Sequence, residues 1–320
     1  MRLMQSLSRE KPFKAWEFIL LCAVVAVVLY IYRGAFSGFF MFDDFGWLKF
    51  SRFETLGQHL RRFLEFNGAR TYRPLSQETL FFIGQFLFGL RPLGFHCMSF
   101  AFHILGTVTL YFLLRQFFPP LSSITGTLFY GVHNAHTLAV YWISAIPEPM
   151  AAAFYAISFF FFIRFDRTGR LKFYALSLLA AALGIMSKES ILTLPLAIIA
   201  YCLLLGKWRW KWAIPYFVLP MATIVGRLTG TAGASPYPLT FGSEALHNLF
   251  AYISWMAGFS DSLIMMKLHW ELHHTLIAAV TILILAGLVW FCRADNTGLF
   301  AVTWLLLALQ PVLYFSGHYF

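Results

Sequence analysis

The run Trp16–Arg33, WEFILLCAVVAVVLYIYR, decides the class of fold. Most of its side chains are apolar, and its length is close to the roughly 20 residues that a helix needs to cross a bilayer. No A-x-A-like cleavage site follows it, so an uncleaved signal-anchor helix is favoured over a secretory signal peptide. Basic residues precede the run: Arg2, Arg9, Lys11 and Lys14.

Further apolar runs follow along the chain, and together they predict an all-α integral membrane protein with about nine to ten helices. Several runs are short, which suits helices that stop below the membrane surface and line a wet cavity. The run 248–266 is ambiguous, because Asp261 and scattered serines also suit an interfacial helix. The other expected spans are 16–33, 93–114, 121–132, 149–164, 173–187, 190–205, 212–228, 275–292 and 298–315.

The composition of the whole chain supports this class. Of 320 residues, 59% are hydrophobic and 12% are charged, against about 45–50% and about 25% in soluble domains. These figures exclude a soluble enzyme, a disordered chain, a collagen and a coiled coil. The low charge and 19% aromatic content argue against a nucleic-acid partner despite the net charge of +10. Each cysteine lies in an apolar run, so neither a disulfide framework nor a zinc module is expected.

Basic residues in short loops set the expected orientation, because such loops stay cytoplasmic. With alternating spans, the loops at Arg115, Arg167 and Lys207 share the side of the N-terminus. The first extracytoplasmic loop is then about 34–92, and its pattern predicts amphipathic helices lying on the membrane surface. No linker divides the chain, so we expect one polytopic domain over 1–320.

Two adjacent carboxylates, Asp43 and Asp44, stand among aromatic residues just past the first span. Like charge and apolar surroundings raise the pKa of at least one such carboxyl. A general base is tuned in this way, so we predict a catalytic role here. The alternative is a helix N-cap or a solvated loop pair.

Histidines form a second polar group. His133 and His136, three residues apart, share one helix face and suit phosphate binding, proton transfer or metal ligation. No third ligand is identified, so a divalent metal is disfavoured but left open, and no cofactor is predicted. The alternative is a pair hydrogen-bonded to water. His96 and His103 lie roughly on one face of the second span and could face a cavity.

Charged residues beside later spans form a third group. Glu148 begins a membrane helix between two prolines, as a functional acid or as a partner of the helix dipole. Lys188 and Glu189, between two apolar helices, either hold a phosphate or pair with each other. Arg70 and Arg73 suit phosphate oxygens or lipid headgroups. All these groups fall on the predicted outer side, which suits group transfer from a lipid-borne phosphate.

The order of these motifs resembles the GT-C superfamily of membrane glycosyltransferases. It is most similar to protein O-mannosyltransferases of the transmembrane-and-tetratricopeptide-repeat type and their bacterial relatives. The resemblance covers about residues 40–205. The motifs that carry it are Asp43-Asp44, Tyr72-Arg73-Pro74-Leu75, Gly94-Phe95-His96 with His103, His133-x-x-His136-Thr137 and Ser187-Lys188-Glu189.

The resemblance implies a many-helix GT-C fold with an outward-facing cavity. It also implies a polyprenyl- or dolichyl-phosphate sugar donor and a hydroxyl acceptor on protein, glycan or lipid. By position, Asp43 or Asp44 matches the catalytic acid of the first loop, and the two histidines match a conserved pair. Lys188 and Glu189 match the pair beside the donor phosphate. At Ile146-Pro147-Glu148 the acid of the family pattern remains without its arginine, which bears on substrate preference.

The leading hypothesis is therefore an inverting glycosyltransferase that uses a lipid-phosphate sugar. Its donor phosphate would meet Lys188 with Arg70 or Arg73. The alternatives are a transporter or flippase of lipid-linked sugars and a non-catalytic membrane scaffold. The expected location is a bacterial cytoplasmic (inner) membrane, with the site facing outward. The chain stops at Phe320 just after an apolar run, so we expect a short member or a truncated longer protein.

Overall fold

The computed structural model describes residues 12–52, 55–64, 72–207, 209–229, 241–256 and 295–314, with short pieces between 279 and 290. Every regular element within these residues is a helix, which confirms the predicted all-α class. The chain divides into two compact units. Unit 1 holds Met1–Leu194 and Ile214–Thr231, and unit 2 holds Pro195–Ala213 and Ala232–Phe320. The single domain over 1–320 stays a prediction.

Two helices are long and apolar enough to cross a membrane, Pro92–Leu114 and Ile143–Thr168. They cover the expected spans 93–114 and 149–164, and the predicted multi-span membrane fold is confirmed. Half of the predicted span 275–292 lies outside the described residues. Shorter apolar helices occupy further predicted spans: Ala15–Ile31, Leu171–Ile185, Glu189–Leu204 and Asn296–Gln310.

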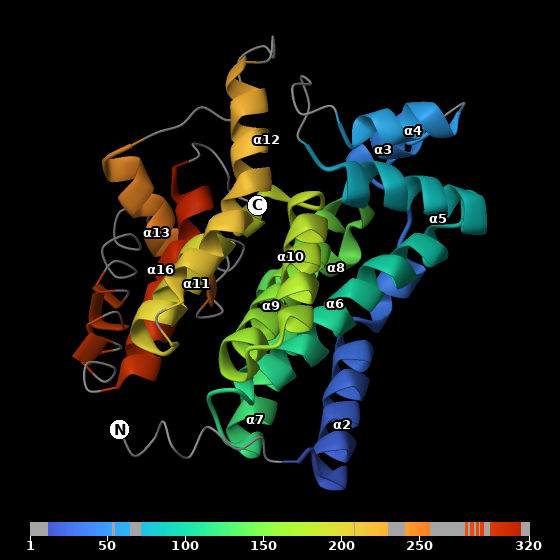
Figure 1. The fold of residues 1–320 in the computed structure, drawn as a ribbon. Coiled ribbons are helices and arrows are strands. Elements are labelled where there is room, and N and C mark those ends of the chain that lie inside the picture. The colour runs from blue at the N-terminus through green and yellow to red at the C-terminus, as the bar shows by residue number, and fades with distance from the viewer. Residues whose placement is uncertain are drawn as a thin grey trace. The chain divides into compact units, whose positions relative to one another are not determined.

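Unit 1 is built around a helix bundle (Figure 1). Within it, α6 packs against α7 and α9, α9 packs against α10, and α2 packs against α7. Large apolar side chains such as Phe159 and Phe162 are fully buried between the helices. The bundle helices are α2 (Ala15–Ile31), α6 (Pro92–Leu114), α7 (Pro120–Val132), α9 (Pro147–Thr168) and α10 (Leu171–Ile185).

Proline and glycine set the boundaries of these helices. Pro92, Pro120 and Pro147 each stand in a first turn, where a missing N–H costs nothing and the fixed φ suits the helix. α9 ends at Gly169, whose φ of 70° lies in the left-handed region that glycine adopts without strain. The chain therefore reverses at once into α10.

Hydroxyl groups connect α9 to α10 inside the bundle. Ser158 Oγ donates to the carbonyl of Ser177 at 2.8 Å, and Ser177 Oγ donates to the carbonyl of Ser158 at 2.6 Å. The hydroxyl of Tyr216 adds a bond to Ser177 Oγ at 2.6 Å. Small hydroxyl residues of this kind let membrane helices approach closely and satisfy their own polar groups.

Short helices gather at the end of the bundle where α6 and α9 begin, here named the site end (Figure 1). The amphipathic helices predicted in the first loop are confirmed as helices, and they expose large apolar side chains such as Phe45 and Phe86. The elements at this end are η1 (Arg33–Ser37), α3 (Asp43–Phe50), α4 (Leu56–Arg62), η2 (Pro74–Thr79), α5 (Leu80–Phe88), η3 (Asn134–His136), α8 (Thr137–Tyr141), η4 (Ile143–Ala145) and η5 (Glu189–Thr193).

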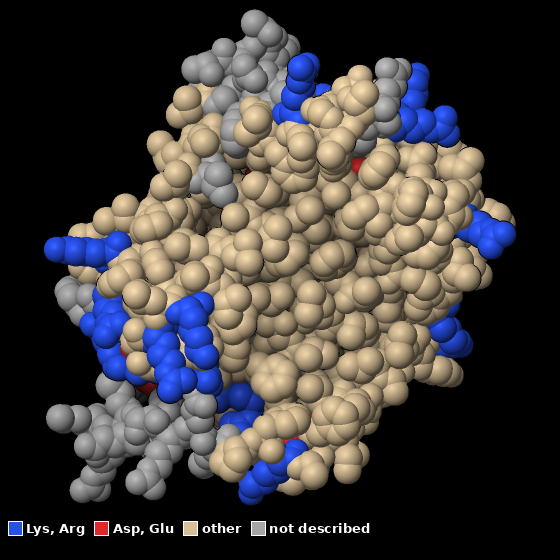
Figure 2. All heavy atoms as spheres, turned by 45° about the vertical axis from the view of Figure 1, so that its right-hand side comes forward, with Lys and Arg blue, Asp and Glu red and all other residues tan. Residues whose placement is uncertain are grey.

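Figure 2 shows the face of the molecule that carries α2, α5 and α6. A broad area of this face bears no Lys, Arg, Asp or Glu, and the basic side chains lie toward its margins. On α2, the large apolar side chains Phe18, Ile19 and Tyr30 are exposed. An apolar band between charged margins is what lipid-facing helices present.

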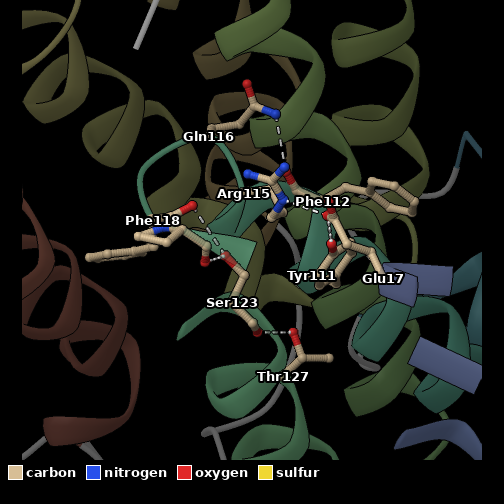
Figure 3. Close-up of polar contacts among 9 residues, drawn as sticks. Glu17, Tyr111, Phe112, Arg115, Gln116, Phe118, Ser123 and Thr127 are labelled. Carbon is tan, nitrogen blue, oxygen red and sulfur yellow. Dashed lines mark hydrogen bonds and ion pairs between the residues drawn. The ribbon is translucent and has the colours of Figure 1, made fainter. Parts of the chain in front are cut away.

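A polar cluster closes the opposite end of the bundle, here named the Glu17 cluster (Glu17, Tyr111 and Arg115; Figure 3). Glu17 is 1% exposed and accepts hydrogen bonds from the Tyr111 hydroxyl and from Arg115 Nε, the latter at 2.9 Å. Beside it, Arg167 donates to the side chain and the carbonyl of Gln116 at 2.8 and 2.7 Å. These bonds fix the start of α2 against the ends of α6 and α9.

The predicted span 212–228 is helical, but its first half is not an α-helix. Residues Trp210–Phe217 form a 3-10 helix (η6), and α12 begins only at Val218 and runs to Thr229. Pro215 lies inside η6, and because proline lacks an N–H and clashes with the preceding turn, an α-helix does not continue through it.

Unit 2 contains α13 (Ser243–Met256) and α16 (Asn296–Leu313), which pack together, and most of α11 (Leu194–Leu204). Asn248 Nδ2 donates to the carbonyl of Leu313 at 2.8 Å. The first half of the ambiguous run 248–266 is thus helical, and its residues from 257 onward lie outside the described residues.

Candidate active site at the site end of the bundle

An ion pair between distant segments is the centre of the candidate site. Arg73 Nε and Nη2 donate to the two carboxylate oxygens of Glu189 at 2.9 and 2.8 Å. Such a paired arrangement is strong and directional. Burial alone would raise the pKa of Glu189, but the hydrogen bonds and the positive charge of Arg73 outweigh it and hold that pKa at about 2. Glu189 is therefore ionised, and both of its carboxylate oxygens are engaged by Arg73.

Lys188 forms the second ion pair, with the carboxylate of Glu148. The side chain of Lys188 is 20% exposed and that of Glu148 is 48% exposed. Burial and the neighbouring charge of Arg73 lower the pKa of Lys188 to about 8, and the charge of Glu189 opposes this shift. The ammonium is thus present at pH 7 in a confined position. Arg73, Glu148, Lys188 and Glu189 are named the site cluster below.

Backbone contacts hold the two arms of the site cluster in register. The backbone N–H of Leu75 donates to the carbonyl of Met186 at 3.0 Å, and Ser76 Oγ donates to the carbonyl of Ser187 at 2.6 Å. Both bonds lie within three residues of Arg73 on one arm and of Glu189 on the other. The Arg-Pro-Leu-Ser and Ser-Lys-Glu motifs therefore form one structural feature.

The two adjacent aspartates have different surroundings. Asp44 is fully buried, and its Oδ1 accepts hydrogen bonds from the hydroxyl and the backbone N–H of Ser144, the latter at 2.7 Å. Its Oδ2 accepts from the backbone N–H of Met41 at 2.7 Å. Burial raises the pKa of Asp44, and these hydrogen bonds and nearby His96 oppose the rise. Asp43 is exposed and makes no hydrogen bond or ion pair within the described chain.

Asp44 and the site cluster are linked through a short stretch of chain. Ser144, which holds Asp44, lies in η4, and four residues later Glu148 contacts Lys188. α3 also packs against both η4 and η2, the element that follows Arg73. The first-loop acids and the later cations thus lie at the same end of the same bundle.

Three histidines come together beside this region. The ring of His136 lies 5.0 Å from that of His103 and 6.5 Å from that of His133, between centroids. It also lies 4.5 Å from the ring of Tyr130. Burial and the two neighbouring histidines lower the pKa of His136 to about 3, so this ring is neutral at pH 7. It can exchange hydrogen bonds but cannot supply a cation.

His96 and His103, predicted to share a face of α6, have different partners. His103 Nε2 lies 2.9 Å from the carbonyl oxygen of Gly131. His96 is buried beside Gly38, where an added Cβ would approach His96 Nε2 to 2.8 Å, and it interacts electrostatically with Asp44. His96 therefore belongs with the aspartates, and His103 with the histidine pair.

The placement of the other predicted residues is mixed. Arg70 lies outside the described residues, so its contact with a phosphate stays a prediction. Within the part of the chain that the structure describes, no three His, Cys, Asp or Glu side chains are arranged to hold a metal ion. The functional roles of the other candidates also stay predictions.

Sequence reasoning missed two residues, one at the site and one in the Glu17 cluster. Ser144 carries no sequence signal, because its role depends on the backbone meeting Asp44 one hundred positions away in the chain. Glu17 had one: it is a lone carboxylate inside an apolar run, and such a residue requires a buried partner. Arg115, placed only in a cytoplasmic loop from the sequence, is that partner.

Comparison with known families follows the same region of the chain. Residues 78–227 match the family model described as dolichyl-phosphate-mannose-protein mannosyltransferase. The match includes the histidines, Glu148, Lys188 and Glu189, and it begins after Asp43, Asp44 and Arg73. Over these residues the chain is therefore similar to the protein O-mannosyltransferases, as its motifs predicted.

Two curated relatives agree with this finding. The protein O-mannosyl-transferase TMTC3 of Homo sapiens is 28% identical over 95 residues, which is 30% of this chain and 10% of that protein. TMTC3 of Mus musculus is 30% identical over 90 residues, which is 28% of this chain and 10% of that protein. The matched part thus spans about a tenth of the length of these relatives. No solved structure matches the chain.

Proposed function

We propose that this relative of the protein O-mannosyltransferases transfers a sugar from a polyprenyl- or dolichyl-phosphate donor to a hydroxyl acceptor. A protein is the acceptor that the matched family favours. The site end faces the extracytoplasmic side in this proposal, in keeping with the basic loops at the opposite end. The membrane is a bacterial cytoplasmic (inner) membrane, as expected for a chain without long soluble insertions.

One observation carries the proposal: cations and acids from four distant segments meet at one end of a membrane bundle. Arg73 and Glu189 form one pair, Lys188 and Glu148 form the other, and Asp44 is bound through Ser144 to the same region. A reaction between a lipid-borne phosphate and a polar acceptor needs such a concentration of charge beside the apolar band. The lipid tail would stay among the helices while the phosphate meets Lys188.

Asp43 is the general base in this mechanism. Its carboxylate is exposed at the first turn of α3, whereas both oxygens of Asp44 are already hydrogen-bonded. Asp43 takes the proton of the acceptor hydroxyl as its oxygen attacks the anomeric carbon of the sugar. Asp44 is a positioning residue that holds the turn before α3 against η4.

Lys188 stabilises the leaving group. As the new glycosidic bond forms, the bond between the anomeric carbon and the phosphate oxygen breaks, and its electron pair remains on the phosphate. In this proposal the ammonium of Lys188 stabilises this charge, and Arg73 orients the neighbouring Glu189. The products are an inverted glycoside and polyprenyl phosphate.

Incubation of the purified protein with radiolabelled polyprenyl-phosphate sugars and a peptide acceptor tests the proposal. We expect labelled peptide together with free polyprenyl phosphate, and we expect Asp43→Asn to abolish both while leaving the helical content unchanged. Full turnover by a folded Asp43→Asn variant would refute the assigned base. Movement of intact donor across a proteoliposome membrane, without release of polyprenyl phosphate, would instead identify a flippase.

A further inference from the structure

The two carboxylates of the site cluster are held very differently. Glu189 is fixed by two hydrogen bonds from Arg73, whereas Glu148 is held by its ion pair with Lys188. Half of the Glu148 side chain is exposed, at 48%, against 32% for Glu189. Glu148 is therefore the carboxylate that a competing anion can displace.

We propose that Glu148 is an exchangeable counter-ion, which occupies Lys188 in the free protein and yields that place to the phosphate of the lipid-linked donor. This inference rests on the proposed function. It assigns to Glu148 a role in donor affinity and product release, and it leaves proton transfer to Asp43.

The limited exposure of Lys188 favours replacement of Glu148 by the phosphate over binding of the phosphate beside Glu148. Only 20% of its side chain is exposed, and Glu148 covers the ammonium that the phosphate would need. An anion arriving from the surface must therefore replace the carboxylate already there. Because Glu189 cannot leave without breaking two bonds to Arg73, the exchange falls on Glu148.

The charges of the site cluster favour the same exchange. Two cations, Arg73 and Lys188, face two carboxylates, Glu148 and Glu189. A donor phosphodiester carries one negative charge, so its exchange for Glu148 keeps the balance. After transfer, the phosphate monoester carries about −1.5 to −2 at pH 7. This excess charge beside Glu189 favours the return of Glu148 and the departure of the product.

The local backbone permits this exchange by side-chain rotation alone. Glu148 stands between buried Pro147 and Pro149 in the first turn of α9, so its main chain is constrained. The side chain still rotates about its own bonds toward solvent. The first turn of a helix also stabilises a carboxylate that has left its lysine.

Binding of farnesyl methyl phosphate, a phosphodiester with one negative charge like the donor, to the full-length protein tests the exchange without requiring catalysis. We expect Glu148→Gln to bind this probe about five- to tenfold more tightly than the wild type, because the competing charge is gone. Glu244→Gln is the matched control, since Glu244 is also an exposed first-turn glutamate but lies in unit 2. Lys188→Gln should lose the binding.

Unchanged or weaker binding by a folded Glu148→Gln variant would overturn the inference and indicate a purely structural ion pair. If that variant fails to fold, Glu148→Asp replaces it. The shorter acid holds Lys188 less well, so about a twofold gain is expected, and no gain overturns the inference. If the wild type transfers sugar to the peptide acceptor but Glu148→Gln binds the probe no more tightly, the exchange alone is refuted. If Glu148→Gln binds the probe more tightly but the wild type transfers no sugar, the proposed transferase is refuted.

Discussion

The two ends of the bundle in unit 1 carry ionic clusters that differ in one respect. In the Glu17 cluster the carboxylate is 1% exposed, and Arg115 is 14% exposed in its side chain. In the site cluster Lys188 and Glu148 are 20% and 48% exposed. A closed ion pair can only hold helices together, whereas an open one can also exchange a partner. Charge inside a membrane protein is therefore a sign of function only when solvent or substrate can reach it.

Removal of the open cation should have the largest effect. We expect Lys188→Met to lower kcat/KM for sugar transfer by about a thousandfold, or about 4 kcal/mol, because the leaving phosphate loses its stabilising charge. The melting temperature should change little, since Glu148 is half exposed and regains water. A large loss of stability with normal turnover per folded molecule would mean that both ends of the bundle serve the same structural purpose.

Removal of the closed cation should have the opposite signature. Arg115→Met leaves Glu17 as a buried carboxylate without its cationic partner, so we expect a loss of about 3 kcal/mol in the free energy of unfolding. Thermal unfolding in detergent measures this loss. Transfer per folded molecule should remain at the wild-type value, and a selective loss of turnover would break the comparison.

Substitution of Ser144 should have an intermediate effect, because this residue is buried and also holds Asp44 at the site end. Ser144→Ala removes the hydroxyl that donates to Asp44 and keeps the backbone N–H bond. We expect a cost of about 1 to 2 kcal/mol, seen as a roughly tenfold fall in kcat with KM unchanged. Ser144→Thr, which retains the hydroxyl, should recover most of the activity. A failure of this rescue would contradict the positioning role.

The pH dependence should produce the smallest change and should separate the clusters again. The pKa of Lys188 is lowered to about 8, so its ammonium is present below pH 8 and is lost as the pH rises through that value. Transfer should therefore fall about twofold between pH 7 and pH 8 and further above it. In Lys188→Arg this upper limb should disappear, because arginine stays charged. If the fall in transfer at high pH persists in Lys188→Arg, another titrating group causes it.

The sequence predicted the apolar helices because hydrophobic length is local information. Residues 93–114 and 149–164 match described helices closely, and the motif order predicted the similarity to protein O-mannosyltransferases that is found over residues 78–227. The span 212–228 begins as a 3-10 helix. This start was not predicted, although its cause, Pro215, is visible in the sequence. The prediction followed hydropathy and did not apply the rule that proline interrupts an α-helix.

The arrangement of the site was only partly predictable. The sequence selected both aspartates but could not tell that Asp44 is buried and Asp43 exposed, since that depends on Ser144 in a distant segment. It left open a pairing of Lys188 with Glu189, whereas Glu189 binds Arg73 and Lys188 binds Glu148. Neighbours in sequence at a tight turn point in different directions, and only the fold selects their partners.

The bond between Arg73 and Glu189 joins residues separated by 116 positions. During synthesis, the ribosome has delivered most of the bundle before Glu189 emerges, so Arg73 waits through the insertion of α6, α7, α9 and α10 without its partner. A nascent chain arrested before that point has no assembled site. Completion of membrane insertion thus becomes a condition for assembly of the site cluster.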